Sequence, residues 1–439
     1  MKSYSPRIFG RRVKKVAKKL SVRRRHLRLN SNDQVRVRRM RKIILAILFK
    51  RHHHDTLLSK DEKEQLENAY RVAVIYYLYL VTYDDETHDK TPSKNRMISS
   101  YSDSQCVSKF RFQKQHLQEL VPLLKLDKRC KLRNGIRMPG EEVLLRGLFE
   151  FANAQTNHAV SDEFGRDGSA QSRALTYFVD HMIDNFEHLV VNKDPTTDNL
   201  SWWFRNGLID ESADSIEIKA GVQLGNEEKV STFIDCNCLP SCRVGGGPAD
   251  DGANSARWNP SIQRAFYNSW KSVDGLKHQT VVVAHGFCVD MYGPTSLRRH
   301  DLTLFRESDI NSRFRNLQLY KDIQNIILGD SAYVRLSHSR SYFKRGGEGH
   351  AIWNRKMKRV RISIEWDYGA VASLFPYLSN EKKLKILQCP KMVSRVYKLA
   401  TILRNLHIGF YGCQSSNYFD IVIRDDFVKH YLTQTDFDA

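Results

Sequence analysis

Three acidic residues have types and positions that could build a metal site. Asp235 follows the apolar segment STFI, Asp330 follows IILG, and Glu365 lies 35 positions beyond Asp330. A carboxylate at the end of a strand is held rigidly at the rim of a sheet, where a site can be assembled. Converging carboxylates can hold two divalent ions that hydrolyse a phosphodiester bond. Their oxygen atoms favour Mg²⁺ or Mn²⁺ over zinc.

Spacing alone is weak support for this metal site. The chain has 49 acidic residues, so many such trios exist, and ordinary capping or surface roles are the alternative. Asp367, beside Glu365, would point elsewhere on a helix, so we expect it to be structural.

Strands and helices alternate around the acids, from about residue 225 onward. Val230–Cys236 has the pattern of a strand, and Thr280–Ala284 with Phe287–Tyr292 has that of a hairpin. Asn325–Asp330 is another apolar run, and 391–407 is an amphipathic helix. The alternation predicts a mixed α/β domain.

The segment around Glu365 has two competing patterns. Alternate residues of 360–368 are apolar, as in a strand, but Ile364, Tyr368 and Val371 recur at helical spacing. The residues alone leave both conformations open.

A helix, a short helix, a glycine turn and a longer helix are predicted before this domain. Glu141–Asn153 has one apolar face, His158–Phe164 stops at Gly165, and Ser169 could cap the last helix. The order is typical of a helix-turn-helix, although a plain helical bundle has the same spacing. We expect DNA contacts from exposed side chains at the turn and the start of the last helix, namely Arg166, Gln171, Ser172 and Arg173.

Short segments in a fixed order surround the acids. They are DEFGRDGSAQSRAL (162–175), FID with Asp235, FYNSWKSVDGLKHQTVVVAHG (266–286), YGPTSLRRHDLTLFRES (292–308), LGDSAY (328–333), RISIEWDYG (361–369) and LRNLHIGFYG (403–412). From about 140 to 420 the chain thereby resembles the nuclease family of Harbinger-type transposases and their domesticated relatives.

The resemblance implies a ribonuclease-H-like fold and assigns roles to the acids. Asp235 would lie on the first strand, Asp330 after a later strand and Glu365 on the helix that follows, which favours the helical pattern there. These three residues would be catalytic, and they would bind Mg²⁺ or Mn²⁺ together with Asp301 of the HD pair.

The chain departs from the family pattern in places. The family commonly follows its first Asp with Gly-Thr, where this chain has Cys236-Asn237, and Tyr368 replaces the Phe of the FG pair. The loop GGGPADDG (245–252) is also unusual. None of these changes removes an acid.

The net charge of +21 is concentrated near the N-terminus. Residues 1–51 contain 19 Lys and Arg and one acid, Asp33, whereas the rest is nearly neutral. Such an arm self-repels, does not fold alone and suits DNA or nuclear import. A solubilising tail or a membrane-surface binder is the alternative. Arg298 and Arg299 could also face DNA phosphates.

The 439 residues are expected to form several units. The predicted divisions are a basic arm (1–60), a helical region with a linker (61–135), the helix-turn-helix region (136–195), the nuclease domain (225–378) and a C-terminal helical segment (379–439). No apolar run approaches the ~20 residues that cross a bilayer, and the N-terminus does not have the pattern of a secretory signal.

Eight scattered cysteines are expected to be reduced and intracellular. Cys236, Cys238 and Cys242 could suggest zinc, but they lack the paired spacing of a structural zinc site.

The sequence therefore predicts a metal-dependent DNA endonuclease and transposase that acts on transposon ends in the nucleus. By resemblance alone, a separate Myb-like DNA-binding protein is an expected partner, and an oligomer is compatible with the sequence. The chief alternative is a domesticated protein that binds DNA without cutting it, and a structural interaction protein is a third class.

Overall fold

The structure of the chain is a computed structural model that describes residues 97–192, 198–222, 227–242, 264–269, 271–319, 322–381, 383–386 and 389–437. The described residues belong to one compact unit, which is bounded by residues 94 and 439. The predicted arm (1–60) and the loop 245–252 lie outside the described residues, and the region 61–135 is described only from residue 97.

A mixed sheet carries the predicted acids. Its strands are β3 (Glu228–Pro240), β4 (Tyr267–Asn268), β5 (Val273–Val283), β6 (Cys288–Ser296), β7 (Gln324–Leu328) and β8 (Ser339–Arg340). In the described residues the order is β4–β5–β3–β7–β8, and β6 also pairs with β5. β3, β5 and β6 pair in antiparallel fashion, whereas β3, β7 and β8 run parallel. The fold class is therefore mixed α/β, as predicted.

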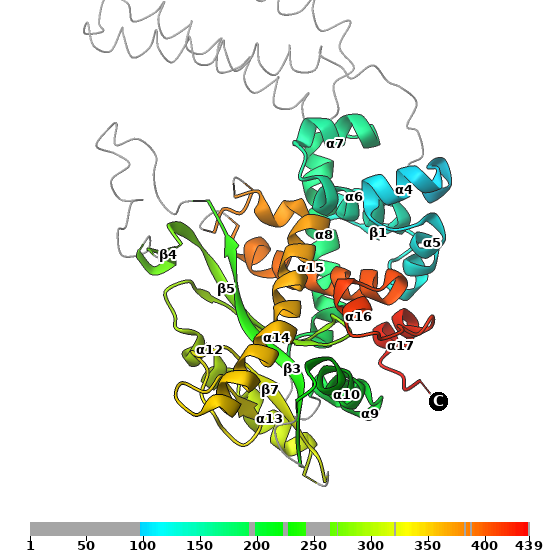
Figure 1. Cartoon of the computed structure of the whole chain (residues 1–439). Coiled ribbons are helices and arrows are strands. Elements are labelled where there is room, and N and C mark those ends of the chain that lie inside the picture. The colour runs from blue at the N-terminus through cyan, green and yellow to red at the C-terminus, as the bar shows by residue number, and fades with distance from the viewer. Residues whose placement is uncertain are drawn as a thin grey trace, which may run out of the picture. The chain divides into compact units, whose positions relative to one another are not determined.

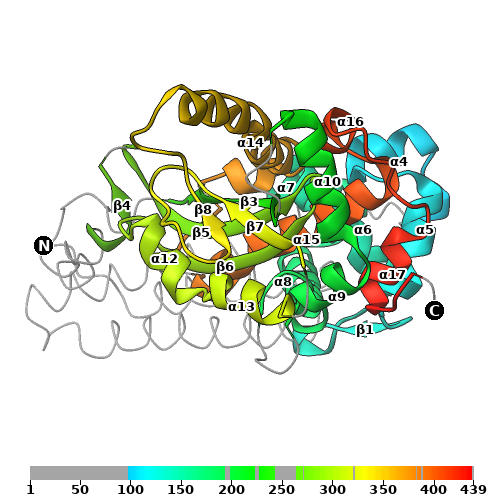
Figure 2. The same ribbon diagram turned by 60° about the horizontal axis from the view of Figure 1, so that its bottom comes forward.

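Helices cover both faces of this sheet. Those around it are α9 (Leu200–Arg205), α10 (Leu208–Ala220), α12 (Asp301–Glu307), α13 (Ile310–Leu317), α14 (Glu348–Leu374), α15 (Pro390–Tyr411), α16 (Gln414–Tyr418) and α17 (Phe427–Thr433). Figures 1 and 2 show α10 and α14 along one face and α12 and α13 along the other. Because both faces are covered, β5 is buried along nearly its whole length, without alternation.

The remaining helices pack against the sheet domain through α15. They are α4 (Asp103–Phe110), α5 (Lys114–Leu123), α6 (Gly140–Asn153), α7 (Asn157–Phe164) and α8 (Gly168–Phe186), with a small β1–β2 pair (Cys130–Lys131 and Arg137–Met138). α6 and α8 approach closely at Gly147, where a Cβ atom would lie 2.1 Å from the Phe178 ring. α8 in turn packs on α15, so its core is continuous with that of the sheet.

Short 3-10 turns connect several of these elements. They are η2 (Ile98–Ser100), η3 (Arg133–Gly135), η4 (Glu187–Leu189) and η6 (Pro376–Ser379).

Three local predictions can be compared with the structure. The hairpin is present, and it turns at Gly286, where φ is +91° and a Cβ atom would lie 2.4 Å from the Cys413 Sγ atom. The segment around Glu365 is helical, because it lies within α14. The prediction of Ser169 as a cap was wrong: Asp167 caps α8 by accepting a hydrogen bond from the Ala170 N–H at 2.8 Å.

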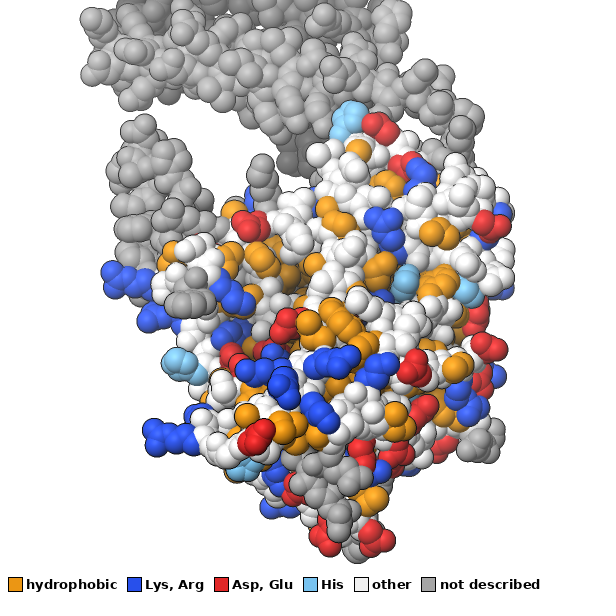
Figure 3. All heavy atoms as spheres, viewed as in Figure 1, with side chains coloured by type: hydrophobic (Ala, Val, Ile, Leu, Met, Phe, Trp, Pro, Cys, Tyr) orange, Lys and Arg blue, Asp and Glu red, His pale blue; other side chains and the backbone are white. Residues whose placement is uncertain are grey.

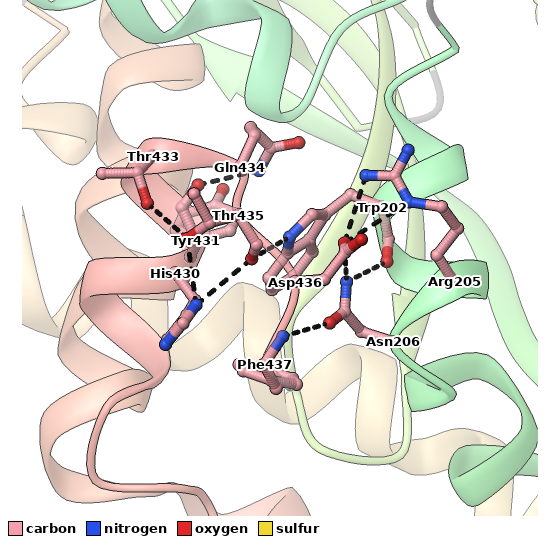
Figure 4. Close-up of polar contacts among 10 residues, drawn as sticks. All are labelled: Trp202, Arg205, Asn206, His430, Tyr431, Thr433, Gln434, Thr435, Asp436 and Phe437. Carbon is pink, nitrogen blue, oxygen red and sulfur yellow. Dashed lines mark hydrogen bonds and ion pairs between the residues drawn. The ribbon is translucent and has the colours of Figure 1, made fainter. Parts of the chain in front are cut away.

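The C-terminal segment is fastened to α9. The Trp202 indole donates to the Thr435 carbonyl at 3.0 Å, and Asn206 exchanges hydrogen bonds with Asp436 and the Phe437 N–H (Figure 4). These contacts close the core around the rings of Trp202 and Phe427. In the part of the chain that the structure describes, none of the helices combines the length and hydrophobicity of a membrane span.

Candidate active site

Strand register places Asp235 and Asp330 side by side. β3 and β7 are parallel neighbours, and Phe233 stands opposite Leu328. Asp235 and Asp330 each follow this pair by two residues. They therefore occupy equivalent positions just beyond the last paired residues of the two strands. Neighbouring strands are about 4.8 Å apart, and equivalent residues point to the same face. The two carboxylates therefore lie close together.

The pKa of Asp330 records this proximity. Burial raises it above its ordinary value, and the neighbouring charges of Asp235 and Asp301 raise it further. The Ala332 N–H, which donates to Asp330 Oδ1 at 2.8 Å, and the charge of Arg361 act in the opposite direction. The net increase means that Asp330 loses its proton less readily than an isolated aspartate.

The third predicted acid reaches the same place from α14, through an arginine one turn before it. Arg361 Nη1 donates to Asp235 Oδ2 at 2.8 Å, and Nη2 contacts Glu365 Oε1 at 3.4 Å. Arg361 Nε donates to the Tyr342 hydroxyl at 2.9 Å. One guanidinium thus joins Asp235 and Glu365, which are 130 positions apart in the sequence.

The setting of Arg361 keeps it charged. Burial alone would lower the pKa of its guanidinium, but the hydrogen bonds to Asp235 and Tyr342 and the negative charge of Asp235 outweigh burial and raise it. The carboxylates remain more open to solvent, since the side chain of Glu365 is 59% exposed and that of Asp235 is 21% exposed.

Tyr368 of α14 contacts β5, the strand that pairs with β3 at Asp235. Its buried hydroxyl lies 2.7 Å from the Thr280 hydroxyl, and Thr280 is the β5 residue opposite Asp235. Burial, and then the charge of Asp235, raise the pKa of Tyr368, so the phenol is neutral. The replacement of Phe by Tyr in the FG pair thus gives a hydrogen bond that a phenylalanine could not make.

Asp301 approaches from the other face of the sheet. It begins α12, and its Oδ1 accepts a hydrogen bond from Lys277 Nζ at 2.8 Å. Lys277 stands opposite Cys238, so its side chain is on the face away from Asp235. Asp301 thus has a cationic partner of its own, and its charge still reaches Asp330, whose pKa it raises.

Cys236, the departure from Gly-Thr, lies beside Asp301 on that second face. Burial raises the pKa of its thiol, and the charge of Asp301 raises it further, so Cys236 is a neutral thiol. The structure pairs none of the cysteines in disulfides.

The carboxylates fit a divalent metal in their chemistry. Asp235, Asp330 and Glu365 supply hard oxygen donors, which Mg²⁺ and Mn²⁺ prefer. Within the described ranges, however, no three His, Cys, Asp or Glu side chains are gathered closely enough to hold an ion. The guanidinium of Arg361 lies between Asp235 and Glu365.

The predicted DNA-contact residues around α8 divide into two groups. Ser172 is exposed and Arg173 partly so. The prediction that Gln171 is exposed was wrong: it is 5% exposed, accepts a hydrogen bond from Arg146 and donates to the Val160 carbonyl at 3.2 Å.

Arg166 is also engaged inside the protein. Its Nε and Nη2 atoms each donate to Glu142 at 2.8 Å, in a bidentate pair. Glu142 also accepts from Arg146, whose pKa burial lowers to about 10. Arg166 and Gln171 therefore hold α6, α7 and α8 together.

Arg298 and Arg299 are exposed at the turn before α12. Arg299 is paired with Glu307, and Arg298 donates to the Arg264 carbonyl at 3.4 Å. Both remain at the surface.

Two residues of the site were missed by the sequence reasoning: Arg361 and Tyr342. The sequence did contain a signal for Arg361. It is the first residue of the motif RISIEWDYG, and it stands four residues before Glu365, on the same face of a helix. Tyr342 carried no comparable signal. Asp367 is buried, which agrees with the structural role predicted for it. Burial raises its pKa to about 6, and Arg404, at 3.5 Å, acts in the opposite direction.

Residues 251–405 match the family model of DDE superfamily endonucleases. The match covers about a third of the chain, and it is consistent with a transposase-derived nuclease. It contains Asp301, Asp330 and Glu365, whereas Asp235 precedes it by 16 residues. No curated protein and no solved structure matches the chain. DDE superfamily endonucleases generally use divalent metal ions and act on DNA, so the family agrees with the chemistry of the carboxylates.

Proposed function

We propose that the chain is a metal-dependent DNA endonuclease of the Harbinger transposase type, which cuts and joins strands at transposon ends. The observation that carries the proposal is the alignment of Asp235 and Asp330 on neighbouring strands, with Glu365 reaching the guanidinium that holds Asp235. A ribonuclease-H-like fold is part of the proposal. It is supported by an acid on the first strand of the sheet, one after a later strand and one on the helix that follows.

In this proposal Asp235, Asp330 and Glu365 would hold two Mg²⁺ or Mn²⁺ ions. When bound, these ions supply an activated water and neutralise charge on the phosphodiester. Asp235 and Asp330 are fixed by strand register, and Glu365 sits on a continuous helix, so each carboxylate is presented by a rigid element. Arg361 would leave Asp235 and Glu365 on loading and keep its hydrogen bond to Tyr342.

Recognition of DNA is assigned to other parts of the chain. We propose that Ser172 and Arg173 on α8, and Arg298 and Arg299 before α12, contact DNA, while the arm (1–60) adds sequence-independent affinity in the nucleus. A Myb-like partner and an oligomer belong to the proposal through the resemblance alone.

One observation favours a second function, DNA binding without cutting. Arg361 already pairs with Asp235 and Glu365 without a metal, as a protein that had lost its metal would require. If this second function holds, divalent ions will not bind at the carboxylates.

Nicking of supercoiled DNA by the full chain, with Mg²⁺ or Mn²⁺, tests the proposal. We expect nicking by the wild type, and by an Asp425→Ala control whose carboxylate is exposed between α16 and α17. Asp330→Ala should abolish it. Equal nicking by wild type and Asp330→Ala would exclude the proposed site, and absence of nicking in all three would favour the binding protein.

A further inference from the structure

The exposed face of α14 has three basic side chains in the turns before Glu365. Arg355, Lys358 and Arg359 are exposed, and Glu365 follows one to three turns later on the same side. The opposite side of α14 is fixed inward by a buried stripe of Trp353, Met357, Val360, Ile364 and Val371. Figure 3 shows Lys and Arg side chains gathered on the face over α14. We name Arg355, Lys358 and Arg359 the α14 basic face.

Among the described residues, these cations have no acidic partners. None of the three makes an ion pair with any residue that the structure describes, whereas the neighbouring Arg361 is paired twice. Arg355 and Arg359 stand four residues apart, where like charges destabilise a helix. Their arrangement therefore does not serve the stability of α14, and it suits a polyanion.

A short chain of contacts links the basic face to the carboxylates. Lys358 Nζ lies 5.3 Å from the centre of the Tyr342 ring, and the Tyr342 hydroxyl accepts from Arg361, which binds Asp235. The basic face is thus one side chain away from the site. From Arg355 to Glu365 the helix rises about 15 Å. At 3.4 Å per nucleotide along one strand, this matches roughly four base pairs of duplex.

An exposed apolar residue lies within the basic face. Ile362 is 41% exposed and stands between Arg359 and Glu365 on the helix surface. A phosphate backbone with its sugars offers both charge for the arginines and apolar atoms for such a side chain. We propose that the α14 basic face binds the backbone of the DNA strand that is cut, and guides it to Glu365. This inference rests on the proposed function.

Binding of a fluorescent DNA duplex to the full chain, without divalent ions, tests the proposal by fluorescence anisotropy at several salt concentrations. The variant is Arg355→Gln with Arg359→Gln. The control is Arg424→Gln with Lys429→Gln, which removes the same charge from exposed positions beside and on α17. Each phosphate contact adds about 0.9 to the slope of log K against log salt. We expect the slope of the variant to fall by about two and that of the control to stay near the wild type.

Equal slopes for variant and control would overturn the proposal. Thermal melting should show both variants folded, because the substituted side chains are exposed. A photocrosslinking residue at Ile362 gives a second measurement, in which crosslinking to DNA is expected and its absence would contradict the proposal. The two proposals fail separately. If the slope of the Arg355→Gln, Arg359→Gln variant falls as expected but the wild type does not nick DNA, only the nuclease proposal is refuted. If the wild type nicks DNA but variant and control have equal slopes, only the proposal for the α14 basic face is refuted.

Discussion

Two clusters in this molecule join arginine to carboxylate, and they differ in how completely the protein encloses them. Where α6 meets the turn before α8, Glu142 is held by Arg146 and Arg166, and the side chains of Glu142 and Arg146 are 7% and 2% exposed. At the rim of the sheet, Asp235 and Glu365 share the single Arg361, and Glu365 is largely open to solvent.

The difference separates a structural cluster from a candidate functional one. In the enclosed cluster two arginines bind the carboxylate of Glu142, so this carboxylate needs no external cation. The rim has three carboxylates around one guanidinium, with Asp330 held at a raised pKa by burial and by Asp235. Excess negative charge at an accessible place is what a divalent cation can neutralise.

The largest expected effect concerns the enclosed cluster. Glu142→Ala would leave Arg146 buried without its carboxylate, and breaking a buried pair in this way costs about 3–5 kcal/mol. We expect the free energy of unfolding to fall by that amount in urea titrations. Glu163→Ala, which removes a partly exposed partner of Lys109, is the control and should cost much less. A small effect of Glu142→Ala would show that the two clusters are alike.

The next effect concerns Arg361. Its charge opposes a divalent ion at the rim, and two unit charges about 4 Å apart interact by about 4 kcal/mol at an effective dielectric constant of 20. Solvent screening reduces this value, so Arg361→Gln should tighten Mn²⁺ binding about tenfold, measured by calorimetry. Arg359→Gln, on the exposed side of α14, should change it little. Unchanged or weaker binding in Arg361→Gln would mean that the guanidinium does not compete with metal.

A smaller effect is expected at Tyr368. Tyr368→Phe restores the family residue and removes the hydrogen bond to Thr280, which is worth about 1 kcal/mol of stability. Denaturant titration should show this loss, with Mn²⁺ affinity retained because the phenol does not bind the ion. A stability equal to that of the wild type would show that the hydroxyl contributes nothing.

The smallest effect is expected at Asp301. Because its carboxylate pairs with Lys277 on the other face, Asp301→Asn should leave Mn²⁺ affinity within a factor of about three. A loss as large as that in Asp330→Asn would instead place Asp301 among the metal ligands, as the resemblance implies.

Local patterns predicted much of the fold. The hairpin of β5 and β6 follows from apolar runs that flank His285-Gly286, and α15 follows from its helical periodicity. The conflict around Glu365 could not be resolved locally, because apolar residues stand at both spacings. Only the structure shows that Ile362, which fits the strand pattern, is exposed, whereas Ile364 and Val371 are buried at helical spacing.

The partners of the acids depend on distant parts of the chain. Arg361 meets Asp235 across 126 positions, and Gln171 is buried because Arg146, 25 positions earlier, reaches it. No periodicity reports such contacts. The acids themselves were recognisable, because each stands at the end of an apolar strand or within a motif of the family.

Calorimetric titration of Mn²⁺ into the full chain tests most directly whether the aligned carboxylates bind metal. Mutation of residues that only support ligands typically costs 10- to 100-fold in metal affinity, so loss of a ligand should cost at least about 100-fold. We predict binding by the wild type and by Asp425→Asn, and its loss in Asp330→Asn and in Asp235→Asn. Equal Mn²⁺ affinity in all four proteins, or none in the wild type, would contradict a metal site at Asp235 and Asp330.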